Sequence, residues 1–324
     1  MKIKTIITFF VIFILCSTAI SVSGLKINTT KEKIEEKNEQ KIGKSGDNCA
    51  FFIAGSGTID WPSSGAIFER VATNAKNMFD SYGNYKTWIK IKPNRRDVKD
   101  VIENQIPNNL GNNKQIFIYI GAHGDIAGSL LMKFSILLLP ISVSTYDLSS
   151  WINNMESKLS KKGISYSYLT IVIESCYGGQ HISSLSKNKR IVITSTDHDS
   201  SAYGNDAGEM YFSDTFFGAI SNGESYGRAW EVADQKIDNM PSIRVQNPQL
   251  EDTGNQKSVG TDDPDILPIW DGDNNYPNAK DGKIAKNYKP NSKAKVKYKQ
   301  STLIKFPILQ RLFPDLFKPR EIGY

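Results

Sequence analysis

Two short stretches carry residue types used in nucleophilic catalysis, and each follows an apolar run. Residues 118–125 read Ile-Tyr-Ile-Gly-Ala-His-Gly-Asp, and residues 171–179 read Ile-Val-Ile-Glu-Ser-Cys-Tyr-Gly-Gly. A cysteine attacks as its thiolate, and a nearby imidazole either lowers the thiol pKa or carries the proton to a leaving amine. Cys176 is therefore a candidate nucleophile and His123 a candidate proton carrier.

Glycines beside both residues fit the same chemistry. They let a substrate backbone approach closely, and they leave backbone amides to hold an oxyanion; the natural donors are the amides of Gly124 and Cys176. A cysteine after a strand is, by itself, more often a small buried apolar residue. The second strand end with its histidine is what favours catalysis.

The elements that must position these residues are apolar strands that alternate with amphipathic helices along the chain. The strands are expected at 50–54, 87–91, 116–120, 169–173 and 191–194, and the helices at 66–82, 95–105, 148–162, 212–221 and 226–239. Several strands are apolar on both faces, which indicates a sheet covered by helices on each side. We predict a three-layer αβα fold with a mostly parallel sheet of about six strands. Because parallel strands end at one edge, His123 and Cys176 are expected to share a crevice.

Two finer features are predicted within this domain. Residues 129–143, with Pro140, interrupt the alternation and indicate a hairpin or flap beside the crevice. Helices are expected to start near Asp214 and Ser225.

Composition limits the class of protein. The 324 residues are 39% hydrophobic and 23% charged, which is typical of globular proteins. The three cysteines, Cys16, Cys49 and Cys176, are too few for a disulfide scaffold, although the last two could pair. A net charge of +6 is too weak to indicate a nucleic-acid partner.

The N-terminal residues resemble an export signal. Residues 1–24 combine two lysines, an apolar run from Ile6 to Cys16 and small polar residues, which predicts a signal peptide and a secreted or extracytoplasmic protein. Residues 25–48 contain six lysines and five acidic residues, and they are predicted to be a mobile leader, either a propeptide or a solvated spacer.

The predicted catalytic domain spans 49–241, and two segments of different character follow it. Residues 242–281 form an acidic loop region whose aspartates, at 262, 263, 265, 271 and 273, either bind calcium or are simply solvated. Residues 282–324 form a basic tail; from Lys280 onward 12 basic residues face three acidic ones. Its closing apolar segment, 303–313, is expected to dock on the domain, to contact an anionic cell surface or to be removed on maturation.

The His-Gly pair, followed 53 residues after the histidine by the cysteine of Glu-Ser-Cys-Tyr-Gly-Gly, resembles the caspase-fold (clan CD) cysteine peptidases. Within that clan the chain is most similar to the legumain (C13) group. Residues 192–203 resemble the strand and loop that border the family's specificity pocket, and residues 208–213 resemble the segment leading to the next helix. The resemblance covers 51–238.

The resemblance implies roles for particular residues. Cys176 would be the nucleophile, His123 the proton carrier, and the Gly124 and Cys176 amides the oxyanion hole. Glu174, Ser195 and Glu209 would bind substrate, although Glu174 could equally be a helix-amide partner. No arginine follows the Gly-Ser turn after the first strand, so the resemblance does not carry over asparagine specificity. With Glu174 and Glu209 in the pocket, a basic P1 residue, as in gingipain-like or clostripain-like relatives, is an alternative to asparagine.

The expected function is that of a secreted cysteine endopeptidase, made as a zymogen, which acts on protein or peptide substrates with no cofactor beyond the calcium considered above. A non-catalytic surface binding protein on the same fold and a transpeptidase using the same dyad are the alternatives. The basic tail could associate with a cell surface. His181 is expected on an exposed helix and His198 in a loop near the pocket; no regular zinc-ligand spacing joins them to Cys176.

Overall fold

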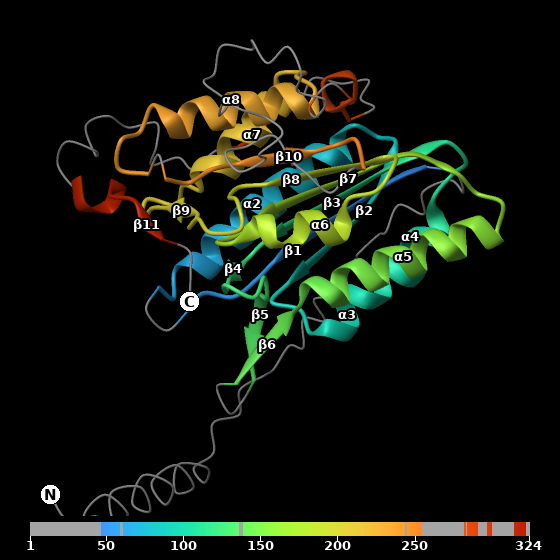
Figure 1. Ribbon diagram of the computed structural model, residues 1–324, viewed down its shortest axis with the longest axis horizontal. Helices are drawn as coiled ribbons and strands as arrows, with labels where there is room; N and C mark the ends of the chain where they lie inside the picture. The colour runs from blue at the N-terminus through green and yellow to red at the C-terminus, as the bar shows by residue number, and fades with distance from the viewer. Residues whose placement is uncertain are drawn as a thin grey trace, which may run out of the picture. The chain divides into compact units, whose positions relative to one another are not determined.

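A six-stranded sheet forms the centre of the computed structural model (Figure 1). The structure describes residues 47–58, 61–135, 139–243, 245–254, 282, 284–290, 297–299 and 314–321, all within one compact unit, Ile42–Tyr324. The strand order is β10-β8-β7-β3-β1-β2. Five parallel strands are β1 (Asn48–Ala54), β2 (Tyr85–Ile91), β3 (Lys114–Gly121), β7 (Tyr166–Glu174) and β8 (Arg190–Thr194). These are the five strands expected from the sequence.

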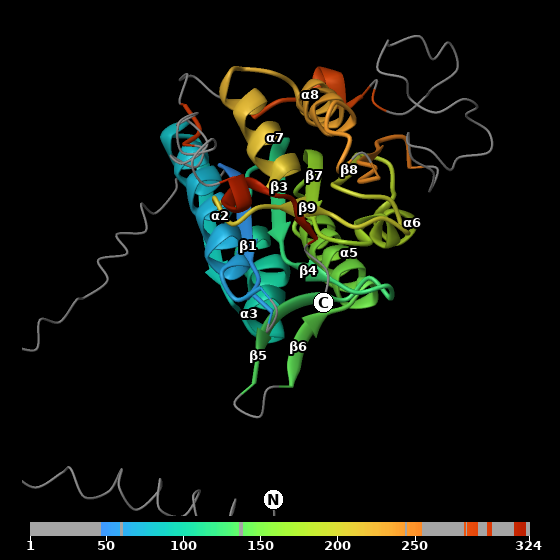
Figure 2. The ribbon, with the colours of Figure 1, turned by 90° about the vertical axis from the view of Figure 1, so that its left-hand side faces the viewer.

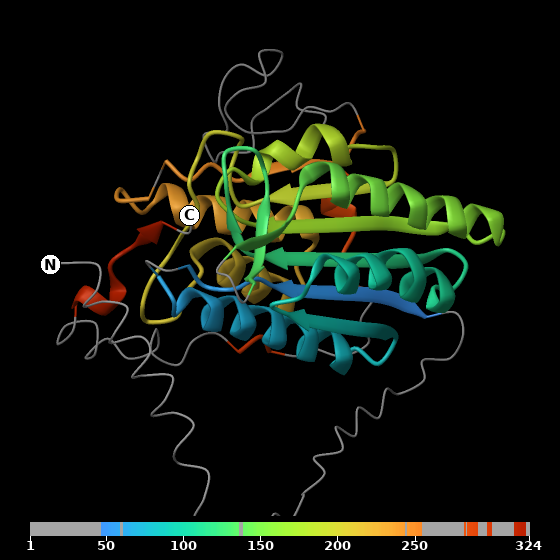
Figure 3. The same ribbon diagram turned by 90° about the horizontal axis from the view of Figure 1, so that it is seen from below.

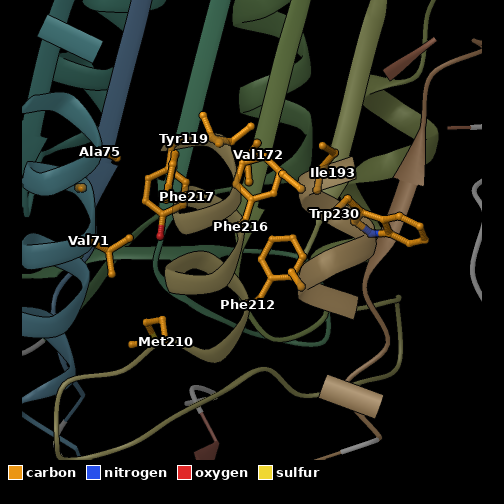
Figure 4. Packing of buried hydrophobic residues seen from close by; sticks show 14 of the residues in the cluster. Val71, Ala75, Tyr119, Val172, Ile193, Met210, Phe212, Phe216, Phe217 and Trp230 are labelled. Carbon is orange, nitrogen blue, oxygen red and sulfur yellow. The ribbon is translucent and has the colours of Figure 1, made fainter. Parts of the chain in front are cut away.

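Helices cover both faces of this sheet (Figure 3). One face packs against α2 (Ser64–Ser81), α7 (Tyr211–Ser221) and α8 (Tyr226–Asp238); the other packs against α3 (Arg95–Asp100), η1 (Val101–Gln105), α4 (Ile106–Asn109), α5 (Thr145–Lys161) and α6 (Ile182–Leu185). Successive strand residues alternate between the two apolar clusters, so Phe52 joins the first and Phe51 the second. Figure 4 shows Phe212, Phe216 and Phe217 packing in the first cluster. The predicted three-layer αβα fold is confirmed.

The helix boundaries refine the sequence expectations. Ser225 caps α8 as expected, since its side chain accepts a hydrogen bond from Arg228 N. By contrast, α7 begins at Tyr211 rather than at Asp214; the Asp214 carboxylate instead reaches back to accept from Met210 N at 2.8 Å. The helix expected at 95–105 is two consecutive segments, α3 and η1, and α4 continues it to Asn109. The π-helical segment, η1, lies shortly before Pro107, which has no N–H to donate to a preceding carbonyl.

The expected hairpin is present at the carboxyl edge of the sheet (Figure 2). Strands β4 (His123–Gly124), β5 (Leu130–Phe134) and β6 (Pro140–Val143) form a small antiparallel sheet directly after β3. A second small sheet joins β9 (Tyr203–Gly204) to β11 (Arg320–Glu321), which run antiparallel.

Chain beyond residue 241 also belongs to the folded core. The sixth strand of the main sheet, β10 (Gln249–Glu251), runs antiparallel beside β8. Ala285, in the short helix η3 (Ala285–Asn287), and Tyr298 are buried in the first apolar cluster. Parts of the predicted acidic loop and basic tail therefore pack on the catalytic domain.

Several sequence predictions lie outside the described residues: the signal peptide, nearly all of the leader, the five aspartates of the calcium alternative, and the apolar segment 303–313. Within the described residues, the helices are too short or too polar to cross a membrane.

Candidate active site

Cys176 lies in a tight turn directly after β7. The two residues that follow β8 form hydrogen bonds with this turn on both sides of the cysteine. Ser195 Oγ accepts a hydrogen bond from Ser175 N at 3.1 Å. On the other side of the cysteine, Thr196 Oγ1 accepts from Gly178 N at 2.8 Å and donates to Ser175 O at 2.9 Å. The residue after Cys176 has left-handed backbone geometry, with φ of 55°. These contacts fix the backbone from which the thiol projects.

The thiol of Cys176 is buried and not part of a disulfide. Its Sγ accepts a hydrogen bond from Ala202 N at 3.1 Å, immediately before β9 begins. Cys49, the other described cysteine, is also free; it lies in the apolar cluster on the opposite face, where burial raises its thiol pKa. The alternative in which the two cysteines pair is therefore wrong for this structure, and Cys176 remains available for chemistry.

Sheet register brings His123 to the level of Cys176. The last paired residues of β3 and β7 are Gly121 and Glu174, and Ala122 N then donates to Glu174 O at 3.1 Å. Two residues further along each strand stand His123 and Cys176. Gly124 is packed so closely that a Cβ there would overlap Ser175 Oγ and the Cys176 carbonyl, so a side chain at this position would separate the two strand ends.

The ring of His123 is fully buried, and its hydrogen bonds fix its tautomer. Nε2 lies 2.7 Å from the Oγ of Ser64, which is the first residue of α2. Ser64 Oγ itself donates to the Trp61 carbonyl at 2.6 Å. Since a hydroxyl has one proton, Ser64 can only accept from His123, so Nε2 carries the ring proton. The basic nitrogen of the neutral ring is then Nδ1. Edge-to-face contacts with Phe68 and Trp61 hold the ring plane.

Trp61 also connects the histidine to the loop after β9. Its indole Nε1 donates to Asp206 Oδ1 at 2.8 Å. The loop carrying Asp206 is closed by Asn205, whose backbone N donates to Glu209 O at 2.9 Å and whose Oδ1 accepts from Glu209 N at 3.0 Å. Sequence reasoning identified neither Trp61, Ser64 nor Asp206 as site residues, because no motif or spacing marks them.

Of the three predicted substrate-binding residues, Ser195 supports the nucleophile turn as described above, and the two glutamates are engaged by neighbouring groups. Glu174 is buried, and its Oε2 accepts from Ser213 N at 2.8 Å, the helix-amide contact that the sequence left open. Burial raises the pKa of Glu174 to about 7, against the lowering effect of hydrogen bonds from Ser213 and Ser195. Glu209 forms an ion pair with Lys236 and accepts from Asn205 Nδ2 at 3.3 Å.

The two remaining histidines take different environments. His181 ends the short helix η2 (Gly178–His181) and is fully buried, so the expectation of an exposed position is wrong; burial lowers its pKa to about 4. His198 lies in the loop between β8 and β9, half-exposed, and its Nε2 is 3.1 Å from Asp199 Oδ2. Among the described residues, no group of three or more His, Cys, Asp or Glu is arranged to hold a metal ion.

Comparison with known families shows which family the chain belongs to. A model of the Peptidase C13 family matches residues 66–232, slightly more than half of the chain, and this range includes both His123 and Cys176. The chain belongs to the Peptidase C13 family. This C13 protein is a cysteine peptidase, and the resemblance to the legumain/C13 group is confirmed.

Comparisons with individual proteins add little to this identity. No curated protein matches the C13 chain. Among solved structures, it is similar to the crystal structure of caspase-1 from Spodoptera frugiperda, with a TM-score of 0.47 and 10% identity over 66% of this chain and 89% of that one. It is also similar to the crystal structure of Chaetomium thermophilum Raptor, with a TM-score of 0.37 and 13% identity over 57% of this chain and 19% of that one.

Proposed function

We propose that this C13 peptidase is a secreted endopeptidase that cleaves peptide bonds through a Cys176–His123 dyad and an acyl-enzyme intermediate. The observation that carries the proposal is the strand register that sets His123 level with Cys176 at the ends of β3 and β7. The fixed turn around the thiol and the fixed tautomer of the imidazole give it further support.

In the proposed reaction, Nδ1 of His123 takes the thiol proton as Sγ attacks the substrate carbonyl carbon. The resulting oxyanion is stabilised by backbone amides at Gly124 and Cys176. When the C–N bond breaks, the imidazolium gives its proton to the leaving amine. Water then attacks the thioester while His123 accepts a proton, and that proton returns to the sulfur as the acid leaves. Throughout the cycle Ser64 accepts the Nε2 hydrogen bond, which keeps the ring in one orientation.

The proposed specificity is for asparagine or a basic residue at P1. Glu174 and Glu209 were the sequence-based reasons for a basic P1, yet both are already hydrogen-bonded or ion-paired within the domain. Profiling cleavage with peptides that vary the P1 residue distinguishes the two choices.

The test of the function is cleavage of a peptide library by the wild-type chain, by Cys176→Ala and by His123→Ala. The proposal expects cleavage by wild type and none by either variant, together with labelling of Cys176 by a thiol-directed peptide probe. Activity that survives Cys176→Ala would overturn it. A folded protein that neither cleaves nor reacts with the probe would favour the non-catalytic binding protein, and transfer of the acyl group to an added amine in preference to water would favour the transpeptidase.

A further inference from the structure

The peptide group between Ser175 and Cys176 contains one of the two oxyanion donors of the reaction scheme, the Cys176 N–H. Two hydroxyls contact the carbonyl of this same group. Thr196 Oγ1 donates to Ser175 O at 2.9 Å, and Ser195 Oγ donates to the same oxygen at 3.4 Å. All four residues are buried. The direction of the carbonyl is therefore set by the two residues that directly follow β8.

The direction of this carbonyl determines the direction of the Cys176 N–H. A trans peptide group is planar, and its C=O and N–H point in opposite directions. The Cys176 N–H is therefore directed away from Thr196. In the main sheet, β7 lies between β8 and β3. A direction away from the end of β8 leads toward the chain that follows β3, where Gly124 carries the second oxyanion donor of the scheme.

The preceding peptide groups show the same alternation between the two neighbouring strands. Glu174 O accepts from Ala122 N at 3.1 Å on the β3 side, and Ser175 N donates to Ser195 Oγ at 3.1 Å on the β8 side. Ser175 O also faces the β8 side, where it accepts from the two hydroxyls. The next group in this series is the Cys176 N–H, which falls on the β3 side.

The two hydroxyls are held in place before any substrate binds. Gln246 Nε2 donates to the Ser195 carbonyl at 3.0 Å. Thr196 Oγ1 accepts from Gly178 N at 2.8 Å, and because a hydroxyl has one proton, that proton goes to Ser175 O. Donors that are oriented in advance stabilise a developing oxyanion without reorganisation during the reaction. The contacts around Thr196 provide such an orientation.

We propose that Thr196, with Ser195 as its weaker partner, is a positioning residue for the oxyanion hole, because its hydroxyl holds the Ser175–Cys176 peptide group with the Cys176 N–H toward the oxyanion. This inference rests on the proposed peptidase function. The role is distinct from binding a P1 side chain, which the sequence suggested for Ser195. It is also distinct from activation of the thiol, since the hydroxyls contact the backbone before the cysteine and not its sulfur.

The first experiment compares kcat and KM of wild type and Thr196→Val, which keeps the shape of the side chain and lacks the hydroxyl. Removing an oxyanion donor costs about 10²- to 10³-fold in kcat; in Thr196→Val the donor stays and only its orientation is lost, so we expect kcat to fall by about 10- to 100-fold with KM nearly unchanged. Thr196→Ser keeps the hydroxyl and should recover most of the loss. Ser195→Ala should cause a smaller loss, because its contact with the carbonyl is longer.

The matched control is Thr170→Val. Thr170 is a buried threonine of β7, and its hydroxyl interacts with Tyr226 instead of the nucleophile turn. Both valine variants remove one buried hydroxyl, so both are expected to lower the thermal stability of the chain. Only Thr196→Val should lower kcat, which separates positioning from a general loss of stability.

The second experiment separates an effect on the oxyanion from an effect on the thiol. With a peptide aldehyde, the Cys176 thiolate adds to the carbonyl carbon, and the carbonyl oxygen takes the electron pair and occupies the oxyanion position. With iodoacetamide, the thiolate displaces iodide from a methylene carbon, and no oxyanion forms. Thr196→Val should therefore raise the inhibition constant of the aldehyde by about 10- to 100-fold. The rate of Cys176 alkylation, followed by mass spectrometry, should stay unchanged.

The outcomes distinguish this inference from the proposed function. If the wild-type chain shows no turnover that depends on Cys176, the proposed function fails and the positioning role fails with it. If wild type turns over substrate while Thr196→Val keeps wild-type kcat and aldehyde affinity, the positioning role is overturned and the function stands. Equal losses in aldehyde affinity and in alkylation rate would also overturn it, because they would place the effect on the thiol.

Discussion

The hydroxyl of Ser64 offers a sharp test of how His123 is held. In Ser64→Ala the Nε2–H of a fully buried imidazole loses its acceptor. Leaving a buried donor unsatisfied costs about 1–3 kcal/mol. This cost destabilises the ring orientation in which Nδ1 serves as the base. If that whole cost appears in the transition state, kcat/KM drops by roughly 5- to 150-fold. Because Ser64 does not contact substrate in this scheme, the loss should appear in kcat and leave KM nearly unchanged.

The neighbouring serine provides the control. Ser63 is exposed, and its side chain makes no capping hydrogen bond to α2. Ser63→Ala should therefore keep wild-type kcat and thermal stability. Ser64→Thr keeps the hydroxyl and should recover part of the activity, and ¹⁵N NMR of the His123 ring should report the Nε2–H tautomer in wild type and a mixture in Ser64→Ala. Equal kcat values for Ser64→Ala and Ser63→Ala would refute the positioning role.

Four further predictions concern stability and packing. Glu174, with its pKa raised to about 7, retains a proton on folding, so its contribution of about 3 kcal/mol is present below the unfolded pKa near 4.5 and is lost as pH rises to 7; urea unfolding of Glu174→Gln should lack this loss. Burial lowers the pKa of His181 to about 4, so its contribution to stability rises as pH increases from 4 to 6.5 and partly offsets the loss from Glu174. His181→Gln removes this rise, so the free energy of unfolding should fall more steeply with pH across that window. Gly124→Ala should lower probe labelling of Cys176 by about 100-fold, because the new methyl displaces the nucleophile turn; unchanged labelling would show that the turn adapts. Arg70→Met removes the bidentate partner of buried Asp214 and should cost about 3–5 kcal/mol in the free energy of unfolding, measured with urea.

Much of the fold could be predicted because it depends on patterns that are local along the chain. Strands apolar on both faces, such as residues 50–54, require cover on both sides, and that requirement sets the three layers. Likewise, Gly121 and Glu174 end neighbouring parallel strands, so the placement of His123 and Cys176 at corresponding positions just beyond these ends follows from topology alone.

The parts that could not be predicted depend on contacts between distant residues of ordinary type. Ser64 is 59 residues from His123, and Trp61 is 145 residues from Asp206; nothing in their local sequence indicates either partner. His181 was expected on an exposed helix, yet its side chain is fully buried, because burial depends on packing by distant parts of the chain. The strand β10 escaped prediction because three residues are too few for a detectable alternation.

Trp61 contacts two parts of the site through two chemically different groups. Its main-chain carbonyl holds Ser64, and through it His123, whereas its indole N–H holds Asp206 beside β9. A substitution can alter the indole but cannot remove the carbonyl. Trp61→Phe is therefore a change that keeps the apolar ring and the orientation of the histidine while it releases the carboxylate. At this one position, the loop after β9 and the ring of His123 can therefore be perturbed separately.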